Sequence, residues 1–166
     1  MMSKTEQYLK EAFAGESQAN RRYLAFAAKA DQEGYPQVAR LFRAAAEAET
    51  IHAHSHLRAL NGIRSTRENL LEAVAGETHE FTKMYPEMIE AAKAEGHKVG
   101  QRSFSYANEV EKIHAQLYQS ILDSLGKSQE SYPYYICPVC GMTAEKEAPA
   151  ICPVCGTKGS LFRRVN

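Results

Sequence analysis

The feature that most constrains this chain is a pattern of acidic and histidine residues that occurs twice. Each copy has a lone glutamate, followed at a similar distance by a Glu-x-x-His motif. The six residues are Glu16, Glu49 and His52 in the first copy and Glu77, Glu111 and His114 in the second. Residues three apart share one face of an α-helix, so each motif can present a carboxylate oxygen and an imidazole nitrogen together. The pattern therefore predicts two pairs of helices that carry metal-binding side chains.

The helices themselves are predicted from the spacing of apolar residues. Apolar side chains recur with the period of an amphipathic α-helix, and the six acidic and histidine residues fall on the same stripes. Glycine- and proline-containing breaks separate the stripes, and Ser65-x-x-Glu68 has the form of a capping box. We therefore expect four helices at approximately residues 4–31, 36–60, 66–94 and 97–125.

The two halves differ in length near the second lone glutamate. Six residues separate Glu16 from Tyr23, whereas seven separate Glu77 from Tyr85. One inserted residue within a helix is most easily accommodated as a π-bulge, and such bulges are common at functional sites. We expect a bulge between Glu77 and Tyr85 that turns Glu80 toward the metals as a seventh ligand.

The donor set indicates which metals these helices would bind. Two lone glutamates and two Glu-x-x-His motifs provide four carboxylates and two imidazoles, which suit iron or manganese. Four buried carboxylates without cations would repel one another and would be costly to desolvate. This is the known ligand arrangement of ferritin-like dinuclear proteins, which predicts a two-metal centre.

The C-terminal segment contains a second candidate metal site. Two identical Cys-Pro-Val-Cys-Gly knuckles supply Cys137, Cys140, Cys152 and Cys155. Paired knuckles bind one metal tetrahedrally, and the glycine after each lets backbone N–H groups point at sulfur. Iron there can transfer one electron, whereas zinc would be structural, and the spacing leaves that choice open. The segment is short enough that we expect its folding to depend on the metal.

Composition excludes several other functions. The formal net charge is zero, from 20 basic and 20 acidic residues, which argues against a nucleic acid or an anionic membrane as partner. No apolar run approaches the roughly 20 residues that cross a bilayer, and the N-terminus lacks the apolar stretch of a signal peptide. We therefore expect a cytoplasmic protein whose cysteines are metal ligands and not disulfides.

Taken together, these motifs resemble rubrerythrin over essentially the whole chain. The resemblance implies a mainly α fold: a ferritin-like antiparallel four-helix bundle followed by a small rubredoxin-like metal-binding domain with short β-strands. We expect the di-iron bundle over residues 1–126, a linker over 127–133 and the rubredoxin-like four-cysteine domain over 134–166. Some short family members exchange helix pairs between subunits, and the sequence leaves open whether this chain does so.

The resemblance also implies how the metals would be held. Glu49 and Glu111 would bridge the two irons, Glu16 would be a terminal ligand of one iron, and Glu77 and His114 would bind the other. The four cysteines would bind the rubredoxin-type iron.

Four further roles follow from the same resemblance. Glu80 matches the extra glutamate that separates rubrerythrins from storage ferritins. In the family, the first iron shifts between that glutamate and the position of His52 as the redox state changes. Tyr23 and Tyr85 match tyrosines that hydrogen-bond to ligands near the site. Glu80, His52, Tyr23 and Tyr85 are therefore the expected catalytic residues, with Glu80 as a candidate general acid.

The family activity is the reduction of hydrogen peroxide to water, in oxidative-stress defence. It implies two non-haem irons in the bundle, oxo- or hydroxo-bridged when oxidised, and one iron at the cysteines, with zinc as the alternative. The cysteine-bound iron would relay electrons that come ultimately from NAD(P)H through rubredoxin or a reductase, because the chain has no G-x-G-x-x-G motif. We expect a homodimer in which one subunit's rubredoxin-like iron approaches the partner's di-iron centre.

Two other functions are consistent with parts of the sequence. Ferrous oxidation and iron handling, as in ferritins, would use the helices and a shell of many subunits but needs no electron-returning domain. A zinc ribbon that recognises a partner on a helical scaffold would use the cysteines without any redox relay.

Overall fold

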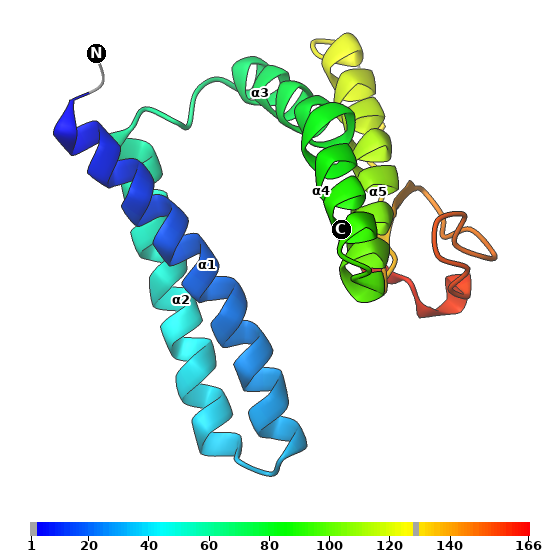
Figure 1. Ribbon diagram of the computed structural model, residues 1–166. Coiled ribbons are helices and arrows are strands. Elements are labelled where there is room, and N and C mark those ends of the chain that lie inside the picture. Colours follow the sequence, from blue (N-terminus) through cyan, green and yellow to red (C-terminus); the bar gives the residue numbers. More distant parts are fainter. Residues whose placement is uncertain (1–2, 128–129) are drawn as a thin grey trace. The chain divides into compact units, whose positions relative to one another are not determined.

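The structure is a computed structural model that describes residues 3–127 and 130–166. It has four long helical segments (Figure 1), followed by a small three-stranded sheet. The chain divides into two compact units, Met1–Arg64 and Ser65–Asn166. The first unit holds one copy of the repeated acidic pattern, and the second unit holds the other copy and the cysteines.

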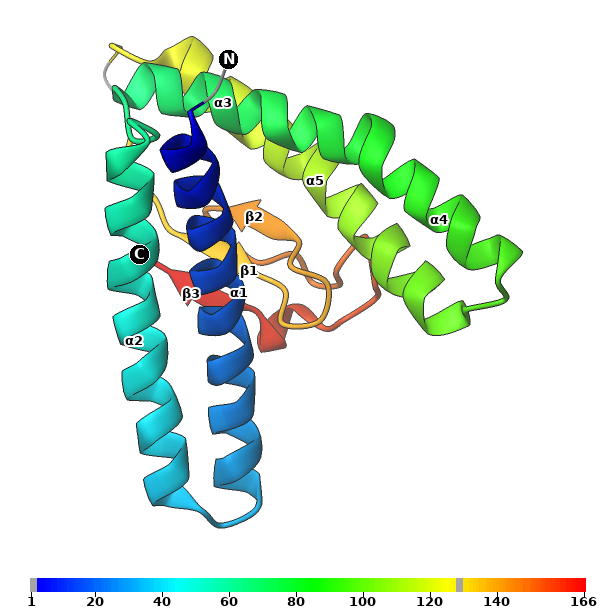
Figure 2. The ribbon, with the colours of Figure 1, turned by 60° about the vertical axis from the view of Figure 1, so that its left-hand side comes forward.

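The first unit is an antiparallel pair of helices, α1 (Lys4–Gln32) and α2 (Pro36–Ala59), which lie side by side (Figures 1 and 2). Ser3 begins α1 with a capping box, in which its hydroxyl accepts from the Glu6 N–H and Glu6 accepts from the Ser3 N–H. The contact surface is made of small side chains, which let the two backbones approach closely. The buried residues are Ala27, Ala30, Ala39, Ala46 and Ala53.

A polar contact and an aromatic cluster fix the register of this pair. The Asn20 amide donates to the Ala46 carbonyl at 2.7 Å and to the Thr50 hydroxyl at 2.8 Å. Toward the α1–α2 loop, the rings of Tyr23 and Phe42 lie 6.0 Å apart between centroids. These contacts hold Glu16 of α1 at the same level as Glu49 and His52 of α2.

The second unit begins with a helical run that pairs with a fifth helix. The run comprises α3 (Thr66–His79), η1 (Glu80–Met84) and α4 (Tyr85–Ala94), and its partner is α5 (Lys98–Ser124). The expected capping box at Ser65 and Glu68 is confirmed at the start of α3. Val110, Ala115 and Leu122 of α5 and Ala92 of α4 are buried in this unit.

The middle of that run is a π-helix and not a continuous α-helix. The segment η1 covers Glu80–Met84, within the stretch where the second half of the chain has one extra residue. The expected bulge is confirmed. Because the extra residue is absorbed locally, Glu77 before the π-turn and Tyr85 after it keep the helix face that their counterparts share in α1.

The C-terminal part of the second unit is a three-stranded antiparallel sheet. The strands are β1 (Tyr134–Ile136), β2 (Thr143–Glu145) and β3 (Arg163–Val165), in the order β2-β1-β3 (Figure 2). Tyr135 pairs with Ala144 on one side and with Arg164 on the other. A single 3-10 turn, η2 (Gly159–Leu161), leads into β3.

The expected fold class is confirmed: helices of the ferritin-like kind followed by a small β-domain with four cysteines. Part of the expected linker, Ser128 and Gln129, lies outside the described residues. Within the described ranges, none of the helices combines the length and the apolar character that crossing a membrane requires.

Candidate metal sites

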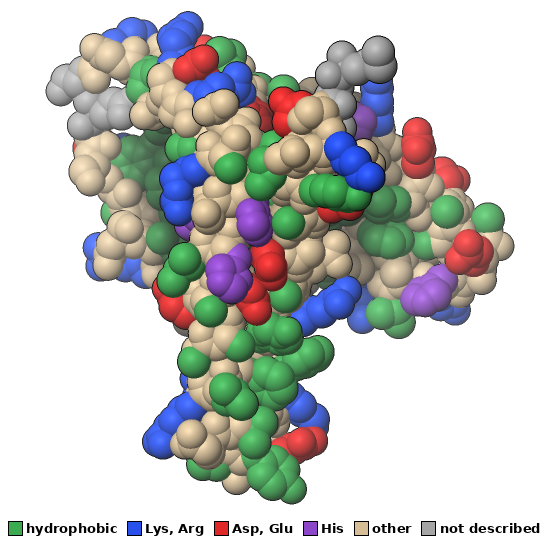
Figure 3. Space-filling view, turned by 90° about the vertical axis from the view of Figure 1, so that its left-hand side faces the viewer, with side chains coloured by type: hydrophobic (Ala, Val, Ile, Leu, Met, Phe, Trp, Pro, Cys, Tyr) green, Lys and Arg blue, Asp and Glu red, His purple; other side chains and the backbone are tan. Residues whose placement is uncertain are grey.

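The first cluster lies on the α1–α2 pair. Glu16 comes from α1, and Glu49 and His52 come from successive turns of α2. One ligand atom from each lies within 4.8 Å of the others, and His52 Nδ1 is 2.9 Å from Glu49 Oε2. Figure 3 shows histidine side chains beside acidic ones on the face of this pair, with hydrophobic side chains gathered toward its loop end. His52 is the most accessible of the three, with 56% of its side chain exposed.

The second cluster repeats this geometry on α3 and α5. Glu77 lies in the last turn of α3, and Glu111 and His114 lie on α5. His114 Nδ1 is 2.7 Å from Glu111 Oε2 and 3.9 Å from Glu77 Oε1. In both clusters Nδ1 is therefore the imidazole nitrogen that faces the carboxylates.

The electrostatics of the second cluster are those of crowded carboxylates. Burial raises the pKa of Glu77 to about 7, and its hydrogen bond with Glu111 and the negative charges of Glu111 and Glu80 add to the rise. Carboxylates that are pushed toward the protonated state by one another are stabilised by cations bound between them.

Glu80 and Tyr85 flank the π-turn beside this cluster. Glu80 is outside the set of atoms within 4.8 Å, but burial and the charge of Glu111 raise its pKa, while His79 and His114 oppose the rise. Burial, followed by the charges of Glu111, Glu80 and Glu77, raises the pKa of Tyr85. The π-turn therefore places one more carboxyl group and a protonated phenol within electrostatic reach of Glu111.

Tyr23 occupies the equivalent place in the first unit. It is partly buried and contacts the rings of Phe26 and Phe42, with centroids 6.4 and 6.0 Å away. Tyr85 makes the matching ring contact with Phe104 at 6.4 Å. Both tyrosines therefore lie on the helix face that carries the metal-binding residues, next to an aromatic neighbour.

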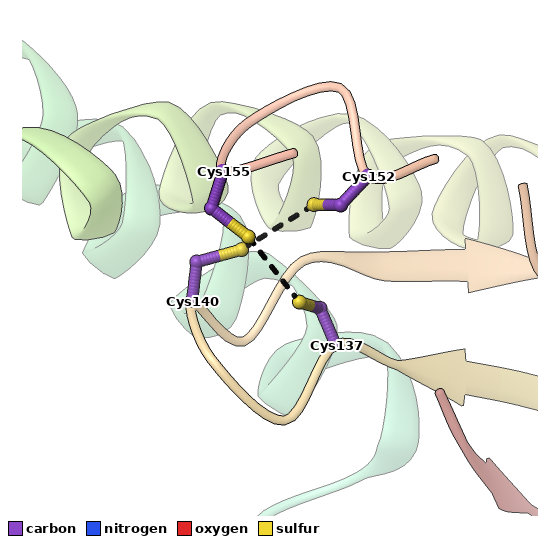
Figure 4. Close-up of side chains that lie close together, drawn as sticks. All are labelled: Cys137, Cys140, Cys152 and Cys155. Carbon is purple, nitrogen blue, oxygen red and sulfur yellow. Dashed lines mark hydrogen bonds between the residues drawn. The ribbon is translucent and has the colours of Figure 1, made fainter. Parts of the chain in front are cut away.

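The four cysteines converge from two loops of the C-terminal domain (Figure 4). All four are free thiols, and their sulfur atoms all lie within 4.8 Å of one another. The Cys137 and Cys155 sulfurs are 3.5 Å apart, as are those of Cys140 and Cys152. These distances are too long for disulfides, whose S–S bond is about 2.05 Å. The cysteines therefore form no disulfides, and their four sulfurs are gathered in a cluster that could hold one metal ion.

The two cysteine loops have the same backbone hydrogen bond and a glycine in the same conformation. The N–H of Cys137 donates to the Met142 carbonyl, and that of Cys152 donates to the Thr157 carbonyl. Gly141 and Gly156 have φ values of +83° and +77°, which favour glycine over any residue with a Cβ. The two knuckles therefore form equivalent turns that face each other.

The donor atoms fit the metals that the sequence predicts. Cysteine sulfurs that bind a tetrahedrally coordinated ion at about 2.3 Å lie roughly 3.8 Å from one another. The observed sulfur–sulfur distances of 3.5 Å are close to this value. Oxygen and nitrogen ligands at about 2.1 Å lie within roughly 4.2 Å of one another, so the carboxylate–histidine clusters need only small side-chain shifts to bind. Oxygen-rich sets with one imidazole suit iron, and four thiolates suit iron or zinc.

Fold and sites together define a class of protein: a helical carboxylate–histidine metalloprotein with an appended rubredoxin-like domain. The family model for Rubrerythrin matches residues 7–122, and that for the rubrerythrin, rubredoxin-like domain matches residues 135–163. The chain therefore belongs to the rubrerythrin family. Its carboxylate clusters and four cysteines provide the candidate di-iron and rubredoxin-like sites expected for that family.

Individual relatives agree with this assignment. The chain is 38% identical over 159 residues to Rubrerythrin-2 of Clostridium acetobutylicum, with 86% of each chain covered. It is 42% identical over 133 residues to rubrerythrin of Porphyromonas gingivalis, covering 72% of this chain and 66% of the other. A structure of nigerythrin in a mixed-valence state matches with a TM-score of 0.60 and 30% identity, covering 99% of this chain and 88% of nigerythrin. Nigerythrin has also been solved fully reduced, with all irons ferrous.

Sequence reasoning did not find two threonines that contact the metal-binding residues. The Thr143 hydroxyl lies 2.9 Å from His114 Nε2, and the Thr157 hydroxyl lies 3.1 Å from Cys155 Sγ. Burial raises the pKa of the Cys155 thiol, but hydrogen bonds from Thr157 outweigh this and lower it to about 6. Both threonines follow a Cys-Gly pair closely, which was the only sequence signal available.

Proposed function

We propose that this protein is a peroxidase that reduces hydrogen peroxide to water at a dinuclear iron centre. The ligands would be the two carboxylate–histidine clusters with Glu80, and the cysteine-bound iron would return electrons to them. The observation that carries the proposal is that the cysteine domain contacts the helix that holds Glu111 and His114, through Thr143 of β2. Iron storage requires no such electron-returning domain beside its metal ligands.

The carboxylates of the clusters would hold the cations and offset their charge. When bound, two ferrous ions would supply the two electrons that, with two protons, convert one hydrogen peroxide into two water molecules. Glutamates can change between one- and two-oxygen binding, which lets the same side chains accept a change in metal charge. The accessible His52 of the first cluster and Glu80 beside the second cluster are the groups we assign to that adjustment.

Protons would be handled by groups around the π-turn. Because the pKa of Glu80 is raised, its carboxyl group retains a proton closer to neutral pH than an ordinary glutamate does, which suits a general acid. Tyr85 remains a protonated phenol and can donate a hydrogen bond toward Glu111 or a bound oxygen ligand. Tyr23, at the equivalent place on α1, would donate in the same way toward the first cluster or a ligand bound there.

The test is stopped-flow oxidation of the anaerobically reduced protein by hydrogen peroxide and, separately, by dioxygen. We expect peroxide to oxidise the protein far faster than dioxygen does, because two electrons complete the reduction of peroxide to water, whereas dioxygen would need four. If dioxygen reacts as fast as peroxide, the protein handles iron as a ferroxidase and the peroxidase proposal is wrong. Metal analysis in the same sample determines whether the cysteines hold iron or zinc.

We also propose that the protein is a homodimer that acts in the cytoplasm, as part of oxidative-stress defence. It would receive electrons from rubredoxin or from a reductase that oxidises NAD(P)H. The absence of a G-x-G-x-x-G motif supports a separate reductase, because the chain has no nucleotide-binding loop of that kind.

A further inference from the structure

The two ring nitrogens of His114 have different partners. Nδ1 faces the carboxylates, 2.7 Å from Glu111 and 3.9 Å from Glu77. Nε2 points the other way and lies 2.9 Å from the hydroxyl oxygen of Thr143, the first residue of β2. Both partners belong to the second unit of the chain. One imidazole therefore connects the helical metal cluster to the cysteine domain.

One arrangement of hydrogen bonds satisfies both neighbours of the Thr143 hydroxyl. The hydroxyl lies 3.3 Å from the Gly141 carbonyl, which can only accept a hydrogen bond. When the hydroxyl donates to that carbonyl, its oxygen is left to accept from His114 Nε2–H. A neutral imidazole that carries its proton on Nε2 has a free lone pair on Nδ1, the form that binds a metal.

The surroundings favour this bond. His114 and Thr143 lie in the wall of a cavity of about 470 Å³ that is otherwise mostly apolar. Its remaining lining residues are Leu70, Leu117, Tyr118, Ile121, Tyr134, Ile136 and Val165. Only 27% of the His114 side chain is exposed, compared with 56% for His52. A hydrogen bond beside apolar side chains competes with less water than one at an open surface.

We propose that Thr143 is a positioning residue that fixes the tautomer and the ring orientation of His114, so that Nδ1 is presented to the metal. Thr143 also follows Cys140 by three residues, and its hydroxyl closes the turn at Gly141. The same side chain therefore sets the position of the first cysteine knuckle relative to a metal ligand of the helices. This inference rests on the proposed ligand role of His114, but not on peroxide being the substrate.

The first experiment is anaerobic titration of the metal-free full-length protein with ferrous iron, with affinity at the carboxylate–histidine site as the readout. Removing such a supporting hydrogen bond typically weakens metal affinity about 10- to 100-fold. We expect that loss in Thr143→Val, which keeps the shape but removes the hydroxyl. Thr143→Ser, which restores the hydroxyl, should recover the affinity. Thr157→Val is the matched control, since that hydroxyl contacts Cys155 and should leave the helical site's affinity unchanged.

The second readout is nitrogen NMR of the His114 ring in protein whose carboxylate–histidine site holds zinc, a diamagnetic stand-in for ferrous iron. We expect zinc on Nδ1 and a slowly exchanging, hydrogen-bonded proton on Nε2 in the wild type, and a faster-exchanging Nε2 proton in Thr143→Val. The proposal is overturned if Thr143→Val binds iron as the wild type does, if Thr143→Ser fails to recover a loss, or if the wild-type zinc is bound by Nε2. These measurements involve no oxidant, so a failed comparison of peroxide with dioxygen would reject the proposed function and leave this result intact.

Discussion

At the scale of single residues, the two clusters share one geometry but differ in their surroundings. In each, an imidazole Nδ1 lies close to the glutamate three residues earlier, at 2.9 Å for His52 and 2.7 Å for His114. His114 is also held at Nε2 by Thr143, whereas more than half of the His52 side chain is exposed. The two metal positions are therefore unequal, with one histidine held firmly and the other better able to move.

The raised pKa of Glu77 predicts how the metal-free protein responds to pH. The folded state binds the Glu77 carboxyl proton more tightly than the unfolded chain does. This proton therefore stabilises the folded state fully at a pH below the ordinary carboxyl pKa, and the stabilisation is lost as the pH rises to about 7. The melting temperature of the metal-free protein should therefore fall over that interval. In Glu77→Gln that fall should be smaller, and identical slopes in the two proteins would contradict the assignment.

Glu80 should matter for the reaction with peroxide. If its carboxyl group supplies a proton, Glu80→Gln should slow oxidation of the reduced protein by peroxide about 100-fold or more. Glu87→Gln, at an exposed glutamate on α4, is the control and should react at the wild-type rate. Stopped-flow absorbance gives the rates, and iron content shows that both variants are loaded. An unchanged rate in Glu80→Gln would remove Glu80 from the reaction.

At the scale of elements, helix positions and the π-turn could be predicted because both depend on the spacing of residues that are near one another in the sequence. The α1 and α2 boundaries fall within one residue of the expected ones, and the extra residue before Tyr85 predicted η1. The contact between Thr143 and His114 could not be predicted in this way. It joins a strand to a helix 29 residues earlier, and such contacts leave no periodic signal in the sequence.

The π-turn predicts an unusual tolerance to deletion. Removing Thr82 should convert η1 into regular α-helix while Glu77 and Tyr85 keep their shared face, with stability changed by no more than roughly 1 kcal/mol. Removing Arg22 from the matching stretch of α1, which has no bulge, should rotate all later residues by about 100°. Ala27 and Ala30 would leave the helix contact, at a cost of roughly 3 kcal/mol or more. Urea unfolding measures both, and equal losses would contradict this account.

At the scale of the whole molecule, the helices carry large apolar side chains that their own unit leaves exposed. On α1 and α2 these include Leu24, Phe26, Val38, Leu41 and Ile51, each at least 42% exposed. A bundle of four helices would cover such faces, and in proteins of that kind the ligands of a dinuclear centre come from all four helices. The sequence predicts a ligand set of this kind, because the candidate ligands repeat with the helices.

The exposed faces predict self-association. Light scattering after size-exclusion chromatography should give a mass of about twice the 18.5 kDa chain. Leu41→Lys, which places a charge on the most exposed of these side chains, should weaken the dimer, while Lys10→Glu on an exposed polar position should not. A monomer at micromolar concentration would contradict the expected homodimer, and a shell of many subunits would favour iron storage.

The measurement that tests the central claim most directly is peroxide consumption by protein whose cysteine site holds zinc in place of iron. The reduced zinc form, supplied with NADH and a rubredoxin reductase, should consume one peroxide per dinuclear centre and then stop, because zinc cannot return electrons. The all-iron form should continue to turn over under the same conditions. Continued turnover by the zinc form would contradict the relay, and failure of either form to consume the first equivalent would contradict the peroxidase itself.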